Sequence, residues 1–397
     1  MMGRARTARI AAAIFAGLVL GPASAQPDSS DPTSTAELER ILGHGPWPPP
    51  ARSDPSNRVS GKRDAILLGE RLFFSPRLSG TGGILCASCH ETWRSFSDGR
   101  PRAVGIAPVD RNTQSLANVR LNRWFGWDGA NDTLWSQSIR PLLDPREMRS
   151  SPAHVAALVR GDPELSGFYE RTFDARPPAS DEALLVDVGK ALAAYQETLA
   201  SDRTPFDEFR DALARRDFEA ASRYPVQARR GLRIFLGKGA CAGCHSGPNF
   251  SDGEFHRTGV ASLLQDGEAD TGRQAGIRKL LAGRYNLLGA FNDDPSRATA
   301  GGTRAASAER DTVAAFRTPS LRDITLTAPY MHDGSAATLC DVALRHPADD
   351  VQDANAARES SRVQLSQDEA HDLVAFLETL TAAPGKTFPG DSPTLCR

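Results

Sequence analysis

The chain has 397 residues, enough for two or three domains, and its 40% hydrophobic and 24% charged content is that of an ordinary globular protein. The formal net charge is −2 at pH 7, which provides no strong basic field to attract nucleic acid or an anionic membrane. Beyond the first 25 residues no segment is apolar enough to span a bilayer. We therefore expect neither a nucleic-acid partner nor a membrane span.

Residues 1–25 have the pattern of a secretory signal peptide. Three arginines precede an apolar run over residues 10–20, and Ala23-Ser24-Ala25 supplies an A-x-A cleavage site. The apolar run is too short to cross a bilayer, so a membrane anchor is the weaker alternative. We expect the chain to be exported.

Residues 26–60 are rich in Pro, Ser and Asp, and predict an N-terminal extension that wraps over the folded part or stays mobile. The pattern G-x-R-[LI]-F then occurs twice, at 69–73 and at 231–235, each time at the end of an apolar helical stretch. This faint internal repeat predicts a duplicated unit, with domains at 61–222 and 223–397.

Helical patterns dominate the rest of the chain. Apolar residues recur at helical spacing over 184–199 with Ser180 as a candidate N-cap, and Ser366 to Glu369 forms a capping box before another apolar face. No run alternates convincingly as a strand does. The fold class we predict is all-α.

Two segments carry the pattern C-x-x-C-H, which is the attachment signature of c-type haem. The two thiols become thioethers to the porphyrin, and the histidine becomes the proximal iron ligand. Coincidental disulfides or a Cys/His zinc site are the alternatives, but two complete copies in an exported chain favour haem. The attachment residues are Cys86, Cys89 and His90 in the first motif and Cys241, Cys244 and His245 in the second. We expect two cytochrome c-like domains, each with one covalently bound c-type haem, in the periplasm.

Together with further motifs, these residues resemble the bacterial dihaem cytochrome c peroxidase and MauG superfamily. The resemblance rests on both haem motifs, on Trp127-Asp128-Gly129 followed by Gln137 and Glu147, and on RTPSLR at 317–322 leading into TAPYMHDG at 327–334. It covers most of residues 60–380.

The resemblance implies that the N-terminal haem, with His90 as proximal ligand, reacts with peroxide. Glu147 would be the carboxylate that moves a proton between the peroxide oxygens, with Gln137 as its partner amide. Trp127 would lie between the two haems. A surface carboxylate and a core aromatic are the ordinary alternatives for Glu147 and Trp127. The loop 96–112 contains no histidine, so we expect an open or water-bound iron that needs no prior reduction.

The family's inter-haem calcium site corresponds to the Asn112 side chain and the backbone carbonyls of Thr327 and Pro329. The distal ligand of the second haem corresponds to His346, where cytochrome c peroxidases have Met and MauG has Tyr. A second imidazole gives a low-spin haem of lower potential than a His/Met haem. A surface histidine is the alternative, and Met331 is the rival ligand.

The remaining residues of note receive structural interpretations. Cys340 and Cys396 are left over and are expected to be bridged outside the cytoplasm. Residues 261–312, rich in Gly, Arg and Asp, predict a large surface loop. His256 is expected near a haem edge, whereas the other histidines with no assigned role, His44, His154 and His371, are expected at the surface or in linkers.

We therefore expect a periplasmic dihaem c-type oxidoreductase that activates hydrogen peroxide at the N-terminal haem and, through the second haem, oxidises a partner protein. The run 125–135 is similar to MauG-like dihaem enzymes paired with methanobactin-type partners. One alternative is a cytochrome c peroxidase that takes electrons from a small cytochrome c or a cupredoxin. Another is a non-catalytic dihaem electron carrier, against which Glu147 and Gln137 argue.

Overall fold

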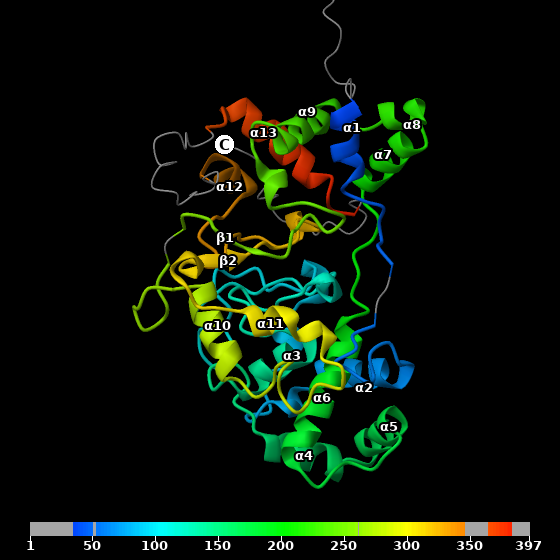
Figure 1. Ribbon diagram of the computed structural model, residues 1–397, viewed down its shortest axis with the longest axis vertical. Helices are drawn as coiled ribbons and strands as arrows, with labels where there is room; N and C mark the ends of the chain where they lie inside the picture. The colour runs from blue at the N-terminus through cyan, green and yellow to red at the C-terminus, as the bar shows by residue number, and fades with distance from the viewer. Residues whose placement is uncertain (1–34, 51–52, 261, 346–363, 383–397) are drawn as a thin grey trace, which may run out of the picture. The chain divides into compact units, whose positions relative to one another are not determined.

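The structure is a computed structural model that describes residues 35–50, 53–260, 262–345 and 364–382 (Figure 1). In this part of the chain the secondary structure is mainly helical. The α-helices are α1 (Thr35–Leu42), α2 (Arg63–Phe73), α3 (Leu134–Leu143), α4 (Pro152–Gly161), α5 (Pro163–Phe173), α6 (Asp181–Gln196), α7 (Pro205–Ala214), α8 (Phe218–Ser222), α9 (Val226–Leu236), α10 (Arg273–Ala282), α11 (Gly301–Ala305), α12 (Leu339–Arg345) and α13 (Gln367–Glu378). Two short strands, β1 (Phe255–Arg257) and β2 (Ala315–Arg317), pair antiparallel with Phe255 opposite Arg317. The mainly α fold class is confirmed.

The two expected long helices form as their caps predict. The Ser180 side chain accepts a hydrogen bond from the backbone of Ala183 at the start of α6. At the start of α13, the side chains of Ser366 and Glu369 each accept a hydrogen bond from the other's backbone N–H. Both caps satisfy N–H groups that a helix otherwise leaves unpaired.

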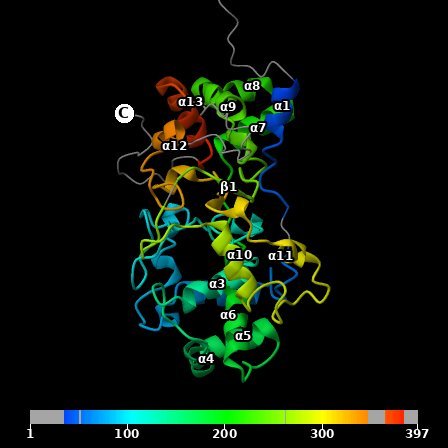
Figure 2. The ribbon, with the colours of Figure 1, turned by 60° about the vertical axis from the view of Figure 1, so that its left-hand side comes forward.

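The sequence repeat corresponds to a repeated helix crossing. The first glycine of the repeat, Gly69 in α2, lies so close to α6 that a methyl group there would overlap the carbonyl oxygen of Ala191. Its counterpart Gly231, in α9, meets the carbonyl oxygen of Asp372 in α13 in the same way. The glycine thus permits close approach of two backbones, and α9 and α13 lie side by side in both views (Figures 1 and 2).

Two large groups of buried apolar side chains follow these crossings. The first includes Leu68 and Leu72 of α2 with Leu192 of α6. The second includes Leu232 of α9 with Phe376 of α13, together with side chains of α1, α7 and α12. Each group adjoins one C-x-x-C-H segment, since Cys86 packs against the first and Cys241 against the second.

The described part of the N-terminal extension is packed against the fold, and the expectation for His44 was wrong. His44 is 4% exposed, and its ring stacks on Phe250 with the two centroids 4.7 Å apart. Trp47 is also buried, and lies under the guanidinium group of Arg322. The error has a physical cause: a single imidazole between glycines, or a single aromatic between prolines, shows no periodicity, so the sequence does not reveal that the side chain faces a core.

The expected surface loop over 261–312 was wrong in part. It contains α10 and α11, and Ile277 and Leu280 of α10 are buried. Asp270 accepts two hydrogen bonds of 2.7 Å from Arg111, which ties this segment to the loop after the first motif. None of the helices described is both long and apolar enough to cross a membrane.

Candidate functional site

The two C-x-x-C-H segments have the same local backbone. Each begins with a 3₁₀ turn, over Cys86–Ser88 and over Cys241–Gly243. The backbone N–H of His90 donates to the carbonyl of the first motif cysteine at 3.0 Å, and that of His245 does so at 2.9 Å. The turn brings both cysteines and the histidine of each motif to one short stretch of chain.

The two histidine rings are held in the same way. His90 Nδ1 lies 2.8 Å from the carbonyl oxygen of Phe96, and His245 Nδ1 lies 3.0 Å from that of Phe250. A carbonyl only accepts, so each Nδ1 carries the proton and each Nε2 keeps a lone pair that can bind a metal. Metal-bound histidines are typically oriented by such a bond.

The phenylalanines that supply these carbonyls have unusual backbones. Phe96 has φ 62° and Phe250 has φ 50°, in the left-handed region that bulky side chains rarely adopt. Such conformations persist where the surrounding structure holds them, and they are concentrated at functional sites. Their occurrence at matching positions of both motifs indicates that the two carbonyls are placed to orient the histidines.

The motif cysteines do not fit the alternative roles. None of the four is disulfide-bonded, so neither motif forms a disulfide. Burial raises the pKa of Cys86 to about 12 and that of Cys241 to about 11, so both are neutral thiols in the cofactor-free chain. Within the described residues, no group of three converging metal-ligating atoms contains both cysteines of a motif.

One group of potential ligands does converge in the described residues, beside the second motif. Cys244, Asp252 and His256 offer atoms that all lie within 4.8 Å of one another. His256 Nε2 is 2.7 Å from Asp252 Oδ2, so the imidazole is already paired with the carboxylate. Since Cys244 is a predicted haem-attachment residue, this places His256 next to the predicted attachment point.

Glu147 lies close to the first motif and forms an ion pair with Arg140. The Arg140 Nη1 to Glu147 Oε1 distance is 2.7 Å. Burial lowers the pKa of His90, and the charge of Glu147 acts in the opposite direction, which shows that this carboxylate is near the ring. Sequence reasoning missed Arg140, although it lies one helical turn after Gln137 in α3.

The Gln137 side chain is bonded to Asn131 rather than to Glu147. Its Oε1 accepts a 2.8 Å hydrogen bond from Asn131, whose own carbonyl accepts from the backbone of Phe125. Gln137 therefore supports the turn 125–131, which contains Trp127. The side chain paired with Glu147 is that of Arg140. Gln137, expected as the partner amide of Glu147, is bonded to Asn131 instead.

The loop after His90 is bonded to the segment that carries Glu147. The Ile106 N–H donates to the Glu147 carbonyl at 3.1 Å, and the Ala107 N–H donates to that of Arg146 at 2.8 Å. Gly105 approaches the Glu147 backbone so closely that a Cβ atom would overlap it. The described loop therefore holds Ile106 against the segment that carries Glu147.

Trp127 contacts the segments that follow both motifs. Its indole Nε1 donates to the carbonyl of Asn112 at 2.9 Å, in the loop after His90. Its own carbonyl accepts from Arg317 of β2 at 2.9 Å, and β2 pairs with β1, which follows the second motif. The His332 ring lies 6.4 Å from the indole, so a second conjugated ring adjoins Trp127.

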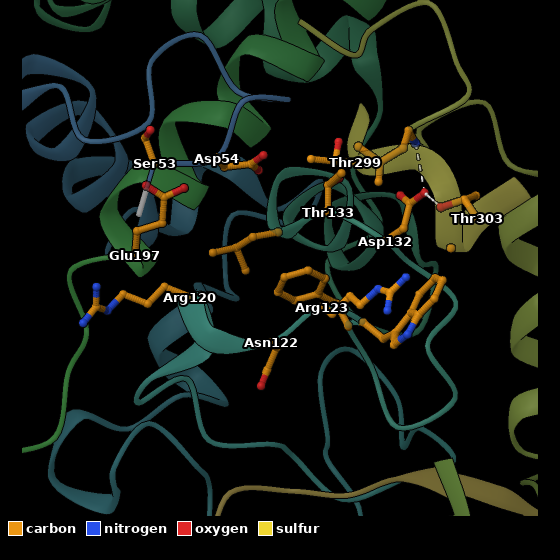
Figure 3. Close-up of a pocket in the computed structure, with 15 residues that line it drawn as sticks. Ser53, Asp54, Arg120, Asn122, Arg123, Asp132, Thr133, Glu197, Thr299 and Thr303 are labelled. Carbon is orange, nitrogen blue, oxygen red and sulfur yellow. Dashed lines mark hydrogen bonds between the residues drawn. The ribbon is translucent and has the colours of Figure 1, made fainter. Parts of the chain in front are cut away.

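A polar cavity of about 210 Å³ lies elsewhere in the fold (Figure 3). Glu197, Asp54 and Asp132 line it, facing Arg120 and Arg123. None of the residues predicted for the functional site lines this cavity. It is therefore separate from the group formed by His90 and Glu147.

Comparison with known proteins gives the family. The model of the family described as di-haem cytochrome c peroxidase matches residues 63–214. The methylamine utilization protein MauG of Methylorubrum extorquens is 34% identical over 323 residues, which cover 81% of this chain and 79% of that protein. The cytochrome-c peroxidase IdrP2 of Denitromonas iodatirespirans is 32% identical, over 82% of this chain and 83% of that protein. The chain belongs to the di-haem cytochrome c peroxidase and MauG family. It is a peroxidase-type oxidoreductase whose family uses haem cofactors.

Solved structures agree with this assignment. A MauG-like protein associated with microbial copper homeostasis is 27% identical and superposes with a TM-score of 0.60, covering 87% of this chain and 98% of that one. A diheme peroxidase from Burkholderia thailandensis, 23% identical, has the same fold with a TM-score of 0.63, over 86% of this chain and 92% of that one.

A buried arginine fits the anionic groups of a family haem. Arg317 is 4% exposed, and burial lowers its pKa to about 10. In the described structure its guanidinium donates only to neutral oxygens, those of Asn122 Oδ1 at 3.3 Å and of the Thr318 and Gly126 carbonyls at 3.2 and 3.4 Å. A buried cation without a carboxylate is costly, and the propionates of a haem would supply the missing charge.

Oxygen atoms also gather at two of the three predicted calcium ligands. The Asn112 side-chain amide lies 2.8 Å from the Arg100 carbonyl oxygen and 3.4 Å from that of Pro329. With the amide turned over, its oxygen would join these carbonyls in the all-oxygen shell that Ca²⁺ prefers. The third predicted ligand, Thr327, lies two residues before Pro329, and its hydroxyl bonds to the Ile324 carbonyl.

Two residues with predicted roles in the C-terminal domain lie outside the described part of the chain. His346, the predicted distal ligand, is one of them, and Cys396 is the other. Cys340 is described and is disulfide-bonded. Met331, the rival ligand, is half-buried, has φ 74°, and packs against the second group of apolar side chains.

Proposed function

We propose that this protein uses hydrogen peroxide to oxidise a partner protein, as a MauG-like enzyme in the periplasm. One c-type haem would be held by Cys86, Cys89 and His90 and a second by Cys241, Cys244 and His245. The haems would supply the redox chemistry, which is the two-electron reduction of peroxide and the transfer of the oxidising equivalents. The two haem domains would be 61–222 and 223–397, after removal of 1–25 and with 26–60 as the N-terminal extension.

The observation that carries this proposal is the repeated support of the two histidines. In both motifs a left-handed phenylalanine carbonyl accepts from Nδ1 and leaves Nε2 for a metal. Among the described residues, the carboxylate beside the first motif, Glu147, is paired with an arginine, whereas the carboxylate beside the second motif, Asp252, is paired with His256. This asymmetry supports peroxide chemistry at the first motif and electron transfer at the second.

Glu147 supplies the acid–base step in this proposal. The carboxylate would take a proton from the peroxide oxygen nearer the haem and return it to the oxygen farther from it. The O–O bond would then break with water as the leaving group. Arg140 holds the carboxylate by the 2.7 Å ion pair and keeps it beside the first motif. Over one turnover, hydrogen peroxide with two protons and two electrons gives two waters, and the partner residue supplies both electrons.

Trp127 is proposed to carry charge between the two motifs. Its ring is fixed at the nitrogen by Asn112, and its backbone is fixed by Arg317. A conjugated ring held in this way shortens the gap that an electron must cross. A Ca²⁺ ion on Asn112, Thr327 and Pro329 would stiffen the same region, and the carbonyl oxygens close to the Asn112 amide support such a site.

A second function is supported by the names of the relatives. The chain resembles proteins named MauG and proteins named cytochrome-c peroxidase at similar identity. In the peroxidase case the electrons would come from a small cytochrome c or a cupredoxin. A non-catalytic dihaem electron carrier is the third alternative, and the Glu147–Arg140 pair near His90 argues against it because a carrier needs no proton-transfer group there.

The test begins with haem content and then compares electron sources. A pyridine haemochrome assay should give two haems per chain, and one after Cys86→Ala with Cys89→Ala. If a small exported copper-binding protein is encoded beside it, purified protein with peroxide should oxidise that protein, with loss of hydrogens detected by mass spectrometry. Turnover with reduced cytochrome c or cupredoxin, and none with the partner, would establish the second function. No turnover with either would establish the carrier.

A further inference from the structure

Two adjacent residues, Arg322 and Asp323, are each bonded to one of the two loops that orient the motif histidines. Arg322 contacts the loop that ends in Phe250, and Asp323 contacts the loop that contains Phe96. Both side chains are buried, at 3% and 8% exposure. The two loops are far apart in sequence, and this dipeptide joins them.

Arg322 makes a fully paired connection to the second loop. Its Nε donates to the Pro248 carbonyl at 2.7 Å, two residues before Phe250. Its two terminal nitrogens donate to the carboxylate of Asp207 at 2.8 and 2.9 Å, so the buried charge is neutralised. The Trp47 ring covers the guanidinium at 3.5 Å. Bidentate pairing and stacking leave the arginine little freedom.

The same loop is also supported from the N-terminal extension. The ring of His44 stacks on that of Phe250, and its Nδ1 lies 3.3 Å from the Gly247 carbonyl oxygen. Ser320, two residues before Arg322, donates to the Asn249 carbonyl at 2.9 Å. The loop before Phe250 is therefore held at successive residues.

Asp323 makes the corresponding connection to the first loop. The Ser95 hydroxyl donates to Asp323 Oδ2 at 3.2 Å, and Ser95 directly precedes Phe96. Asp323 has φ 56°, and its N–H donates to the Leu380 carbonyl at 3.0 Å. The aspartate is thus fixed by its own backbone, and the serine is positioned against a rigid acceptor.

We propose that Arg322 and Asp323 are positioning residues that couple the two proximal histidines, so that a change at one motif alters the other. Neither residue is placed against a reacting atom; each acts through a loop carbonyl. A displacement of this dipeptide moves both carbonyls, because both connecting side chains are buried and packed interiors transmit such shifts. The proposal rests on the haem attachment proposed above.

The first test removes the connection between Ser95 and Asp323, together with the longer 3.4 Å contact of the same hydroxyl with that of Ser115. In the haem-loaded Ser95→Ala variant, the ferric electron paramagnetic resonance signal of the second, His245 haem should shift, although the substitution lies beside the first motif. Ser97→Ala is the matched control, because Ser97 lies in the same loop and is buried, and its hydroxyl donates to the Arg94 carbonyl at 2.8 Å. The control should leave the His245 signal unchanged.

The second test works in the opposite direction. Arg322→Lys keeps a positive charge beside Asp207 but cannot retain both the bidentate pair and the donation to Pro248. Cyanide should bind the ferric His90 haem with a dissociation constant altered about fivefold or more, the lower range of typical coupling between sites. Amide hydrogen exchange should also accelerate in both loops, 91–97 and 246–251.

The coupling would be overturned if each variant changed only the haem nearer to the substitution, and if amide hydrogen exchange changed in only one of the two loops. A failure of the proposed function has a different signature. A wild-type chain with two haems but no cyanide binding would contradict the open first iron, and hydrogen exchange in the two loops would still decide the coupling.

Discussion

Arg140 Nη1 lies 2.7 Å from Glu147 Oε1, and this ion pair joins the last turn of α3 to the irregular segment that follows it. The arginine is fixed by its helix, whereas Glu147 lies in a turn bonded to the loop after His90 through the Ile106 N–H. The pair therefore determines where the carboxylate stands relative to the first motif. It also gives α3 two roles, since Gln137 of the same helix supports the turn that contains Trp127.

Glu147→Gln should slow the reaction with peroxide by about 10²–10⁴-fold, the usual contribution of a positioned acid–base group. Arg140→Gln should slow it less, because the carboxylate remains but is no longer held. Stopped-flow mixing of the ferric protein with hydrogen peroxide measures both rates. A rate for Glu147→Gln equal to that of wild type would return Glu147 to the role of a structural ion-pair partner.

Substitution of either repeat glycine should destabilise the fold. A methyl group at Gly231 would overlap the Asp372 carbonyl oxygen, and one at Gly69 would overlap that of Ala191, so α9 and α13 or α2 and α6 must move apart. Overpacking of this kind typically costs about 1–3 kcal/mol of unfolding free energy. Gly161→Ala is the control, since nothing lies within 4 Å of a Cβ placed there at the end of α4. Thermal unfolding of the three variants, followed by circular dichroism, measures the difference.

The local features of this fold could be predicted from sequence because their signals are local. Periodicity and side-chain caps fix α6 and α13, as the bonds of Ser180 and Ser366 show. The repeat over 69–73 and 231–235 was visible as well, but its cause was not. That cause is the contact of each glycine with a helix more than a hundred residues away, and no pattern within five residues contains that information.

The parts that could not be predicted depend on distant partners. Arg140 resembles any helix arginine until the chain folds Glu147 against it. The Arg322–Asp207 pair joins residues 115 positions apart. His44 is a core residue only because the fold stacks its ring on that of Phe250. In each case the sequence shows an ordinary residue, and the tertiary contact gives it a specific role.

Glu197 should make the stability of the fold depend on pH. Burial raises its pKa to about 7, and Asp54 adds to the rise. The folded state therefore holds this proton more tightly than the unfolded chain, so the folded chain binds more protons between about pH 4.5 and 7 and stability falls as the pH rises through that window. At 1.36 kcal/mol per unit, the loss is at most about 3 kcal/mol.

Glu197→Gln should lack this component of the pH dependence. As the pH is raised from 4.5 to 8, the unfolding free energy of the wild type should fall relative to that of the variant. Denaturant unfolding at a series of pH values measures it, and Glu208→Gln, at an exposed position, controls for the loss of one charge. Parallel curves for wild type and Glu197→Gln would contradict the prediction.

The disulfide at Cys340 should be closed by Cys396. Cys340 is disulfide-bonded, and the four motif cysteines are not in disulfides and would be consumed by haem attachment, which leaves Cys396 as the sixth cysteine. The bridge should add about 2–4 kcal/mol to the stability, chiefly by restricting the unfolded chain. Thiol titration of denatured, unreduced protein should find no free thiol in wild type and one in Cys396→Ser. Two free thiols in wild type would refute the pairing.

His346 is predicted to be the sixth ligand of the His245 haem, and it decides between the two proposed enzyme functions. A bis-His haem is low-spin and of lower potential than a His/Met haem, so it is suited to retaining oxidising equivalents rather than to accepting electrons from a high-potential donor. His346→Ala should convert the second haem to high spin in the electron paramagnetic resonance spectrum. His346→Met should raise its potential and improve turnover with a small cytochrome c.

Met331→Leu is the control, because Met331 packs against the second apolar group and is the rival ligand. If the low-spin signal survives His346→Ala and is lost in Met331→Leu, the thioether is the ligand, and the preference for partner oxidation over plain peroxide reduction loses its main support.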